Sequence, residues 1–327
     1  MTERRADLVL EGGGVKGLGT AGAVMGLLDE GWTFPRVAGT SVGALAAAFA
    51  AAGADSATLR DVLGRLDLRR IPDRRVPVPL LGEGLSLVAG RGAYAGDWIR
   101  EWLLRELDRL GVRTFADLRR DDPGADPALA TPDHRYSLVV MATDVTHGRL
   151  LRLPWDYVGF GLDPDEQLVA DAVRMSLSIP FYFRPCELRN AGTGEVATIV
   201  DGGVLSNFPI EIFDRTDGVP PRWPTFGVRL LPDLPAGLGD VVPFFGVPML
   251  PTVRLLEQVV VTAIVGRDQT HLERPGVRER TMTVDTAGTA ITEFGIGAEE
   301  RRRLVEEGSR TARDFLGRWP GTAATAP

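Results

Sequence analysis

Residues 8–45 read LVLEGGGVKGLGTAGAVMGLLDEGWTFPRVAGTSVGAL and contain two glycine-rich turns. The first turn is Glu11–Gly17 and the second is Gly39–Gly43; each follows a short apolar run and precedes a helix-like segment. Two successive strand–turn–helix units predict a parallel sheet, and the turns at the carboxyl ends of such strands share one edge. We therefore expect Gly13 and Ser41 to be neighbours.

The second turn places Ser41 between Gly39 and Gly43. Small neighbours at these two positions suit a sharp strand-to-helix elbow, which exposes a hydroxyl at a helix N-terminus. Unpaired N–H groups and the helix dipole favour developing negative charge there. Ser41 is therefore a candidate nucleophile, and the alternative is a serine in a purely structural turn.

The first turn contains the successive glycines Gly12, Gly13 and Gly14. Their backbone N–H groups could serve as an oxyanion hole or as a phosphate cradle. Together with Gly17 they also spell G-x-G-x-x-G, but a dinucleotide site would need an acidic residue after the second strand. That strand leads into Ser41 instead, and the pattern lacks the Gly-Lys-Ser/Thr ending of a P-loop. The nucleotide-binding alternative is disfavoured.

Composition limits the broad class of the protein. The 327 residues are 44% hydrophobic and 25% charged, which is ordinary for a globular chain with a sizeable core. A net charge of −7 argues against a nucleic-acid partner. An arginine cluster at 69–75 lies beside apolar sequence and could contact anionic lipid headgroups. Cys186 is the only cysteine, so neither an internal disulfide nor a cysteine metal cluster can form.

The chain is expected to form one domain over residues 5–318, followed by a disordered tail at 319–327. The Pro- and Gly-rich segment 71–96 is either a lid over the substrate or a surface connector. The N-terminus does not resemble a signal peptide, and no apolar stretch is long enough to span a bilayer. A cytoplasmic location is expected, with any membrane contact peripheral.

Hydrophobic periodicity and turn residues define the remaining elements. A helix at 252–265 is apolar almost all round, which favours a buried core helix over an interfacial one. The other predicted helices are 15–30, 55–68, 97–110, 166–177 and 298–316, and the predicted strands are 137–143, 149–153, 196–200, 225–231 and 281–284.

A serine nucleophile needs a base. Of the three histidines, His134 and His147 fall in polar turns, whereas His271 would complete a Ser–Asp–His order. Asp201 ends an apolar strand, and burial beside Ser41 would raise its pKa and make it a better base. The alternative is an aspartate that merely starts a turn before two glycines.

The sequence resembles the patatin-like phospholipase family over nearly its whole length. Three motifs in order carry the resemblance: Gly12–Gly17 resembles the family's oxyanion loop, Gly39–Gly43 its nucleophile motif, and Asp201-Gly202-Gly203, with Asn207 and Pro209 following, its catalytic-aspartate motif. Weaker likenesses are Tyr94–Asp97, Ala142–Asp144 and Ser178–Pro180 with Phe183 and Pro185. The family commonly has arginine where Lys16 stands.

The resemblance implies a three-layer α/β/α sandwich with a mainly parallel central sheet. It also implies a Ser41–Asp201 dyad that cleaves fatty-acyl esters of lipids, as a phospholipase A or lysophospholipase does, without a metal or cofactor. Gly12, Gly13 and Gly14 would form the oxyanion hole, supported by Lys16, Gly39, Gly43, Gly202 and Gly203. The alternatives are a carboxylesterase that uses His271 and a non-catalytic lipid-binding protein on the same fold.

Overall fold

The computed structural model describes residues 4–73, 94–121, 127–129, 131–230, 276–289 and 293–320. The predicted helix 252–265, His271 and most of the 71–96 segment lie outside the described residues.

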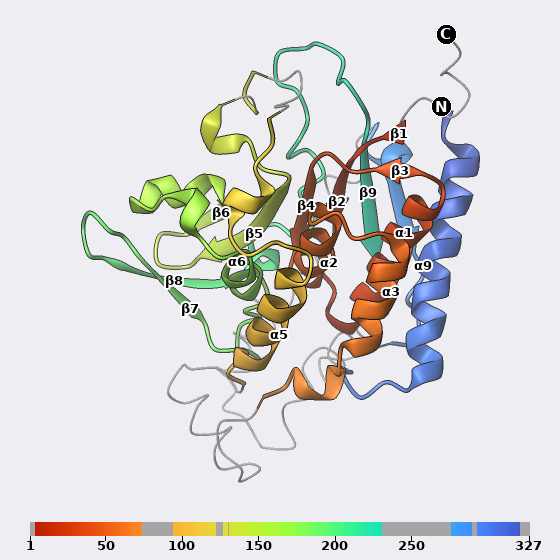
Figure 1. Ribbon diagram of the computed structural model, residues 1–327, viewed down its shortest axis with the longest axis horizontal. Coiled ribbons are helices and arrows are strands. Elements are labelled where there is room, and N and C mark those ends of the chain that lie inside the picture. Colours follow the sequence, from red (N-terminus) through yellow and green to blue (C-terminus); the bar gives the residue numbers. More distant parts are fainter. Residues whose placement is uncertain are drawn as a thin grey trace.

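A central eight-stranded sheet organises the chain (Figure 1). Its strand order is β10-β9-β2-β4-β5-β8-β7, and β6 pairs with β5 in addition. The strands are β2 (Asp7–Leu10), β4 (Val37–Thr40), β5 (Leu138–Asp144), β6 (Arg149–Leu153), β7 (Cys186–Arg189), β8 (Val196–Asp201), β9 (Thr225–Leu230) and β10 (Thr281–Val284). The pairs from β10 to β5 are parallel, whereas β5–β6, β5–β8 and β7–β8 are antiparallel. A separate two-stranded sheet joins β1 (Arg4–Arg5) to β3 (Trp32–Thr33).

The register of β2 and β4 brings the two glycine turns together. Leu8 pairs with Val37 and Leu10 with Gly39, so both strands end at the same level of the sheet. β5 lies on the other side of β4 and pairs at its far end with β8, where Ala142 lies opposite Asp201. Three loops that are distant in sequence therefore emerge at one edge of the sheet.

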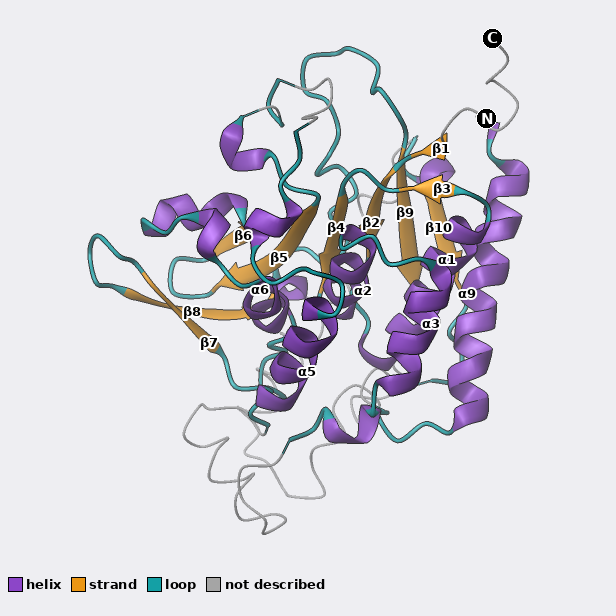
Figure 2. Ribbon diagram, viewed as in Figure 1, coloured by secondary structure: helices purple, strands orange, loops and turns teal. Residues whose placement is uncertain are grey.

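Helices cover the sheet and carry the remaining core residues (Figure 2). They are α1 (Gly17–Asp29), α2 (Val42–Ala51), α3 (Ser56–Arg65), α5 (Asp97–Asp108), α6 (Val169–Ser176) and α9 (Ala298–Arg318). The Ala-rich sequence of α2 suits a helix that is buried on nearly all sides, because small side chains allow close packing against the strands. The longer α5 and α9 are amphipathic and bury one apolar face each.

Small residues let α9 cross α1 at close range. A Cβ atom at Gly308 would lie 2.0 Å from the carbonyl oxygen of Gly19, and one at Gly22 would lie 2.2 Å from that of Val305. The hydroxyl of Ser309 donates a hydrogen bond to the carbonyl of Gly22 at 2.8 Å. The C-terminal helix is thus fixed against the first helix by backbone contact as well as by apolar burial.

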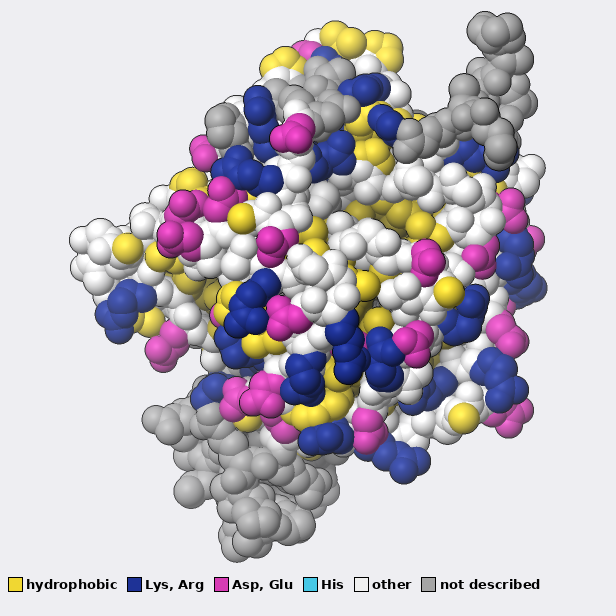
Figure 3. Space-filling model, viewed as in Figure 1, with side chains coloured by type: hydrophobic (Ala, Val, Ile, Leu, Met, Phe, Trp, Pro, Cys, Tyr) yellow, Lys and Arg dark blue, Asp and Glu magenta, His cyan; other side chains and the backbone are white. Residues whose placement is uncertain are grey.

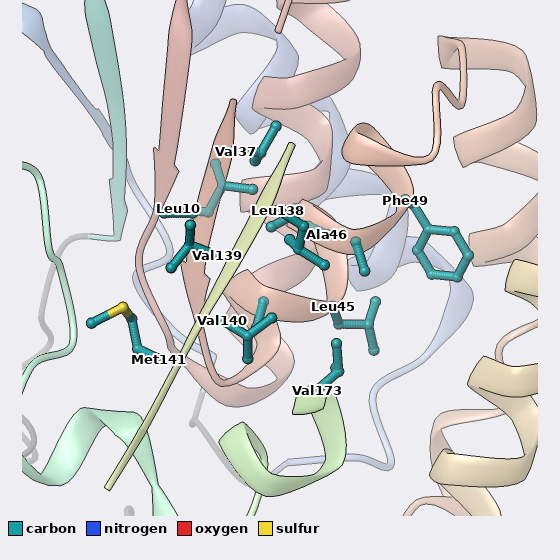
Figure 4. Packing of buried hydrophobic residues seen from close by; sticks show 14 of the residues in the cluster. Leu10, Val37, Leu45, Ala46, Phe49, Leu138, Val139, Val140, Met141 and Val173 are labelled. Atoms are coloured by element: carbon teal, nitrogen blue, oxygen red, sulfur yellow. The ribbon is translucent and has the colours of Figure 1, made fainter. Parts of the chain in front are cut away.

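Apolar side chains fill both faces of the sheet in one continuous cluster that includes Leu10, Val140, Leu45 and Val173 (Figure 4). On β9, Phe226 packs edge-on against Phe315 and Trp319 at 5.1 and 5.0 Å between ring centroids. The segment after β8 covers the opposite face of β9. Gly227 follows Phe226 and faces this segment, and a Cβ atom there would lie 2.4 Å from the ring of Phe208.

The predicted α/β class with a mainly parallel sheet is confirmed, and most helices and strands lie within a few residues of their predicted bounds. The prediction of a disordered tail at 319–327 is wrong for its first residue, Trp319. Trp319 packs on Phe226 and Phe315, because the end of α9 brings its indole back onto the sheet; residues 321–327 lie outside the described residues. Strands β1, β3 and β7 were not predicted, since each is short and partly polar.

Within the described ranges, the helices are too short or too polar to cross a bilayer. Acidic and basic side chains are interspersed over the face drawn in Figure 3.

Candidate active site

Ser41 occupies the elbow between β4 and α2. Its backbone has φ 53° and ψ −126°, a conformation that a non-glycine residue adopts only when the surrounding structure enforces it. Glycines on either side make the bend sterically feasible: a Cβ atom at Gly39 would lie 2.5 Å from the Gly43 carbonyl, and one at Gly43 would lie 2.4 Å from the carbonyl oxygen of Leu10. The side chain of Ser41 is only 4% exposed.

The first glycine turn lies against this elbow. A Cβ atom at Gly12 would come within 2.9 Å of the Ser41 Cβ. The N–H of Gly12 donates to the carbonyl of Asn207 at 3.4 Å. By contrast, the N–H groups of Gly13 and Gly14 donate to no acceptor in the described part of the chain. Of the three candidate oxyanion donors, Gly13 and Gly14 are therefore the ones free to bind an anion.

Asp201 reaches the same place from the end of β8. Its side chain is 2% exposed, and Oδ1 accepts a hydrogen bond from the N–H of Gly203 at 2.8 Å. Gly202 allows the turn to pass close to β5, since a Cβ atom there would lie 2.4 Å from the Met141 carbonyl oxygen. Oδ2 is buried and has no hydrogen-bond partner among the described residues.

The surroundings of Asp201 favour its neutral form. Burial raises the pKa of its carboxyl to about 7, whereas the Gly203 N–H and the Ser41 hydroxyl act in the lowering direction. The Ser41 hydroxyl thus lies near enough to influence the carboxyl, although no hydrogen bond of normal geometry joins the two described side chains.

Two polar residues that sequence reasoning did not single out hold the turns in place. The hydroxyl of Ser176, at the end of α6, accepts the Ser41 N–H at 2.8 Å and donates to the Met141 carbonyl at 2.6 Å. The carboxylate of Glu11 accepts the N–H of Leu230 at 2.7 Å and so ties the glycine turn to the end of β9. Ser176 lies outside the three motifs and Glu11 precedes the glycines of the first one, so only the folded chain reveals these two contacts.

Lys16, the only lysine of the chain, is buried in the short 3-10 helix that follows the glycine turn. Gly17 comes next, and a Cβ atom there would lie 2.2 Å from the Val42 side chain. The N-termini of α1 and α2 are therefore packed directly against each other beside the candidate site.

The two described histidines have partners elsewhere. In the β5–β6 turn, His147 Nδ1 lies 2.7 Å from Asp144 Oδ2 and Nε2 lies 3.2 Å from Glu195 Oε1. His134 Nδ1 lies 2.8 Å from the Ala128 carbonyl oxygen. Both are turn histidines, as predicted. Among the described residues, no group of three or more His, Cys, Asp and Glu side chains is arranged to hold a metal ion.

An apolar pocket borders both glycine turns. Its lining includes Gly14 and Val42, the residue after Ser41, together with side chains of α1, α2 and α3. Nearly all of its described lining is aliphatic or aromatic. The site therefore combines a serine, a carboxyl with a raised pKa, free backbone donors and an apolar recess.

The chain is similar to several known proteins. Residues 8–214 match the model of a family described as patatin-like phospholipase. The uncharacterized protein YqhO of Bacillus subtilis strain 168 is 34% identical over 321 residues, which cover 96% of this chain and 98% of YqhO. VipD from Legionella pneumophila shares the fold with a TM-score of 0.52 and 18% identity, over 97% of this chain and 67% of VipD. ExoU from Pseudomonas aeruginosa, in complex with SpcU, gives a TM-score of 0.49 and 19% identity, and the chain spans about half of it (96% of this chain, 52% of ExoU).

Proposed function

The chain belongs to the patatin-like phospholipase family, and from that premise we propose that it is a serine acyl hydrolase that cleaves fatty-acyl ester bonds of lipids through Ser41 and Asp201. We assign residues 5–318 to one catalytic domain, which meets its substrate at a lipid surface or micelle.

One observation carries the proposal. The serine at the β4–α2 elbow lies beside a buried carboxyl whose pKa is raised to about 7. A carboxyl group with such a pKa is about half ionised near neutral pH, where it can accept a proton and then return it. An aspartate that only started a turn would be expected to lie in solvent with an ordinary pKa.

The reaction would proceed in two halves. Asp201 Oδ2 accepts the hydroxyl proton as Ser41 Oγ attacks the ester carbonyl carbon. The N–H groups of Gly13 and Gly14 hold the resulting oxyanion, an effect of about 3 kcal/mol for each donor. The C–O bond to the leaving alcohol then breaks, and protonated Asp201 gives its proton to that oxygen. Water attacks the acyl-serine in the same way, with Asp201 again taking and returning the proton.

One feature of the site supports a lipid substrate, and a second supports the cleavage of an ester. The pocket lined by Gly14 and Val42 offers apolar contact beside the ester. The N-terminal ends of α1 and α2 meet at the glycine turns, where their dipoles favour a developing negative charge.

The test compares wild type with Ser41→Ala, Asp201→Asn and His271→Ala on a nitrophenyl ester and on a mixed phospholipid micelle. We expect Ser41→Ala and Asp201→Asn to lose at least about a thousandfold in kcat, because each removes a member of a unit that acts together. His271→Ala is expected to retain most activity.

The opposite pattern would favour the esterase that uses His271: an inactive His271→Ala protein and substantial activity in Asp201→Asn. Full activity in Ser41→Ala would contradict both enzyme mechanisms. A folded wild type that turned over neither ester but bound the micelle would favour a non-catalytic lipid-binding protein.

A further inference from the structure

Asn207 holds the first glycine turn at one residue, Gly12. The side-chain Nδ2 of Asn207 donates a hydrogen bond to the carbonyl oxygen of Gly12 at 3.2 Å. The backbone carbonyl of Asn207 accepts the N–H of Gly12 at 3.4 Å. Asn207 therefore binds Gly12 through both of its backbone polar groups, although the two residues are 195 positions apart in the sequence.

The two hydrogen bonds fix different peptide groups. The N–H of Gly12 belongs to the peptide before it, whereas its carbonyl belongs to the Gly12–Gly13 peptide, which also carries the N–H of Gly13. This peptide is trans, so its C=O and its N–H point in opposite directions within one plane. By holding the Gly12 oxygen, the amide of Asn207 directs the Gly13 N–H away from itself.

The Gly12–Gly13 peptide has little else to hold it. Among the described residues, the bond from Asn207 is the one hydrogen bond to the Gly12 carbonyl. Neither glycine has a Cβ atom, so the dihedral angles on both sides of the peptide are largely unrestricted. A rotation by half a turn would place the carbonyl oxygen where the N–H now lies. That oxygen would repel the oxyanion that the N–H is proposed to bind.

The next peptide along the chain is fixed locally. The carbonyl oxygen of Gly13 accepts the N–H of Lys16 at 3.2 Å, at the start of the short 3-10 helix Gly14–Lys16. This contact orients the Gly13–Gly14 peptide and, with it, the N–H of Gly14. Of the two proposed oxyanion donors, Gly13 is thus the one whose direction depends on a residue far along the chain.

The segment that carries Asn207 is tied to the nucleophile elbow. The hydroxyl of Thr40, the residue before Ser41, donates to the carbonyl of Ser206 at 3.2 Å. The N–H of Ser206 donates to the carbonyl of Gly202 at 2.9 Å, in the turn that follows β8. One segment therefore carries the proposed base and the side chain that orients an oxyanion donor, and it is fixed against the elbow.

We propose that Asn207 is a positioning residue for the oxyanion hole, which aims the Gly13 N–H at the oxyanion by holding the Gly12 carbonyl. The inference rests on the proposed acyl hydrolase function. In this role Asn207 acts through the backbone and does not touch the reacting atoms. Its effect is confined to the transition state, because the ester oxygen gains its negative charge only there.

Asn207→Asp is the sharpest test, because it keeps the size of the side chain and replaces the donor group by a carboxylate oxygen. We expect kcat on a nitrophenyl ester to fall by about a hundredfold with little change in KM, as when an oxyanion donor is lost. Asn207→Ala should lose only about tenfold, because the peptide then still samples the productive orientation. A side chain that merely filled space would give the reverse order of the two variants.

Two precautions separate this effect from others. Because the pKa of Asp201 is raised to about 7, kcat is taken from the plateau above pH 8, so that a shift of this pKa does not enter. The matched control is Asn190→Asp, the same change at the only other asparagine of the chain. The side chain of Asn190 donates to the Gly159 carbonyl at 3.3 Å in the turn between β7 and β8, so kcat should be nearly normal.

A transition-state analogue provides a second readout. An alkyl trifluoromethyl ketone adds to the serine: Ser41 Oγ bonds to the ketone carbon, the hydroxyl proton passes to Asp201, and the ketone oxygen becomes an oxyanion with no leaving group. Its inhibition constant should rise in Asn207→Asp by the same factor by which kcat/KM falls. A loss of general stability alone would not produce this match.

The outcomes distinguish failure of the inference from failure of the proposed function. Normal kcat and an unchanged ketone inhibition constant in Asn207→Asp, in an enzyme that Ser41→Ala inactivates, would overturn the inference and leave the hydrolase intact. Full activity in Ser41→Ala would overturn the proposed function itself. Crystal structures of the wild type and of Asn207→Asp decide the orientation without turnover: a rotated Gly12–Gly13 peptide in the variant supports the inference, and an unchanged one contradicts it.

Discussion

Asp201 shows how one residue's surroundings decide its chemistry. Its carboxyl is buried at the end of β8, and among the described residues its one hydrogen bond comes from the backbone of its own turn. Burial raises the pKa of this group to about 7. Two measurable consequences follow, one for activity and one for stability.

The activity of the enzyme should rise with pH through the pKa of Asp201, because only the ionised carboxylate can take the Ser41 proton. We expect kcat/KM on a neutral nitrophenyl ester to increase about tenfold for each pH unit below neutrality and to level off above a midpoint near 7. Stopped assays from pH 5 to pH 9 measure this directly. A midpoint near 4 would contradict the buried-base assignment.

The contribution of Asp201 to the free energy of unfolding should fall as pH rises, whereas activity should rise. In the unfolded chain this group ionises near the ordinary aspartate pKa of 3.8, whereas the folded chain holds the proton until about pH 7. The contribution is therefore fully present below the unfolded pKa and is lost as pH rises through the folded pKa. Asp201→Asn removes the buried charge and should raise the melting temperature more at pH 8 than at pH 5. An equal change at both pH values would show that the carboxylate is not desolvated in the folded protein.

The hydroxyl of Ser176 contacts Ser41 only at the backbone N–H of Ser41. We therefore expect Ser176 to be a positioning residue. Ser176→Ala leaves the buried N–H of Ser41 without an acceptor, at a cost of about 1–3 kcal/mol. We expect kcat to fall by about tenfold or more with little change in KM. Ser137→Ala, which removes a hydroxyl bound to the Leu118 carbonyl, is a control with nearly normal kcat.

At the scale of elements, the crossing of α1 and α9 depends on glycine rather than on large apolar side chains. A methyl group at Gly308 would collide with backbone, which cannot rotate away as a side chain can. A methyl group at Gly317, on the same helix, would meet nothing within 4 Å.

These two glycines give a matched prediction. Gly308→Ala should destabilise the protein by about 1–3 kcal/mol through overpacking. Gly317→Ala should be neutral or slightly stabilising, because alanine favours the helix. Urea unfolding of both variants measures the difference, and equal midpoints would show that α9 does not pack this closely on α1.

At the scale of the whole molecule, the C-terminal helix α9 packs against both the first helix, α1, and strand β9. Trp319 adds to this packing. It stacks on Phe315, with 5.5 Å between ring centroids, and it contacts Phe226. The core is therefore continuous from β2 to the last described residues.

Two truncations test whether Trp319 contributes to this packing. A chain that ends at Arg318 lacks Trp319, whereas a chain that ends at Pro320 keeps it. We expect the shorter chain to be less stable by about 2 kcal/mol, from the lost burial of a half-buried indole. Thermal melting of both proteins gives the comparison, and identical melting temperatures would place Trp319 outside the core.

The sequence by itself determined the elements whose signals are local. Glycine turns after apolar runs predicted the two strand–turn–helix units, and periodicity predicted α5 and α9, because backbone bending and helical amphipathicity are written in neighbouring residues. The sequence also indicated Ser41 and Asp201 as a catalytic pair, but only because three motifs resemble those of the patatin-like phospholipase family. Strand β7 has no such signal, since Cys186–Arg189 is short and mostly polar.

Only the tertiary structure decided properties that depend on residues distant in the chain. The raised pKa of Asp201 needs the burial that surrounding elements provide. The choice of Gly13 and Gly14 over Gly12 as free donors depends on the Asn207 carbonyl, which is nearly two hundred residues away. The pocket is lined by side chains of α1, α2 and α3, which come together only in the folded chain. Desolvation and packing are sums over the folded neighbourhood, so no local pattern can contain them.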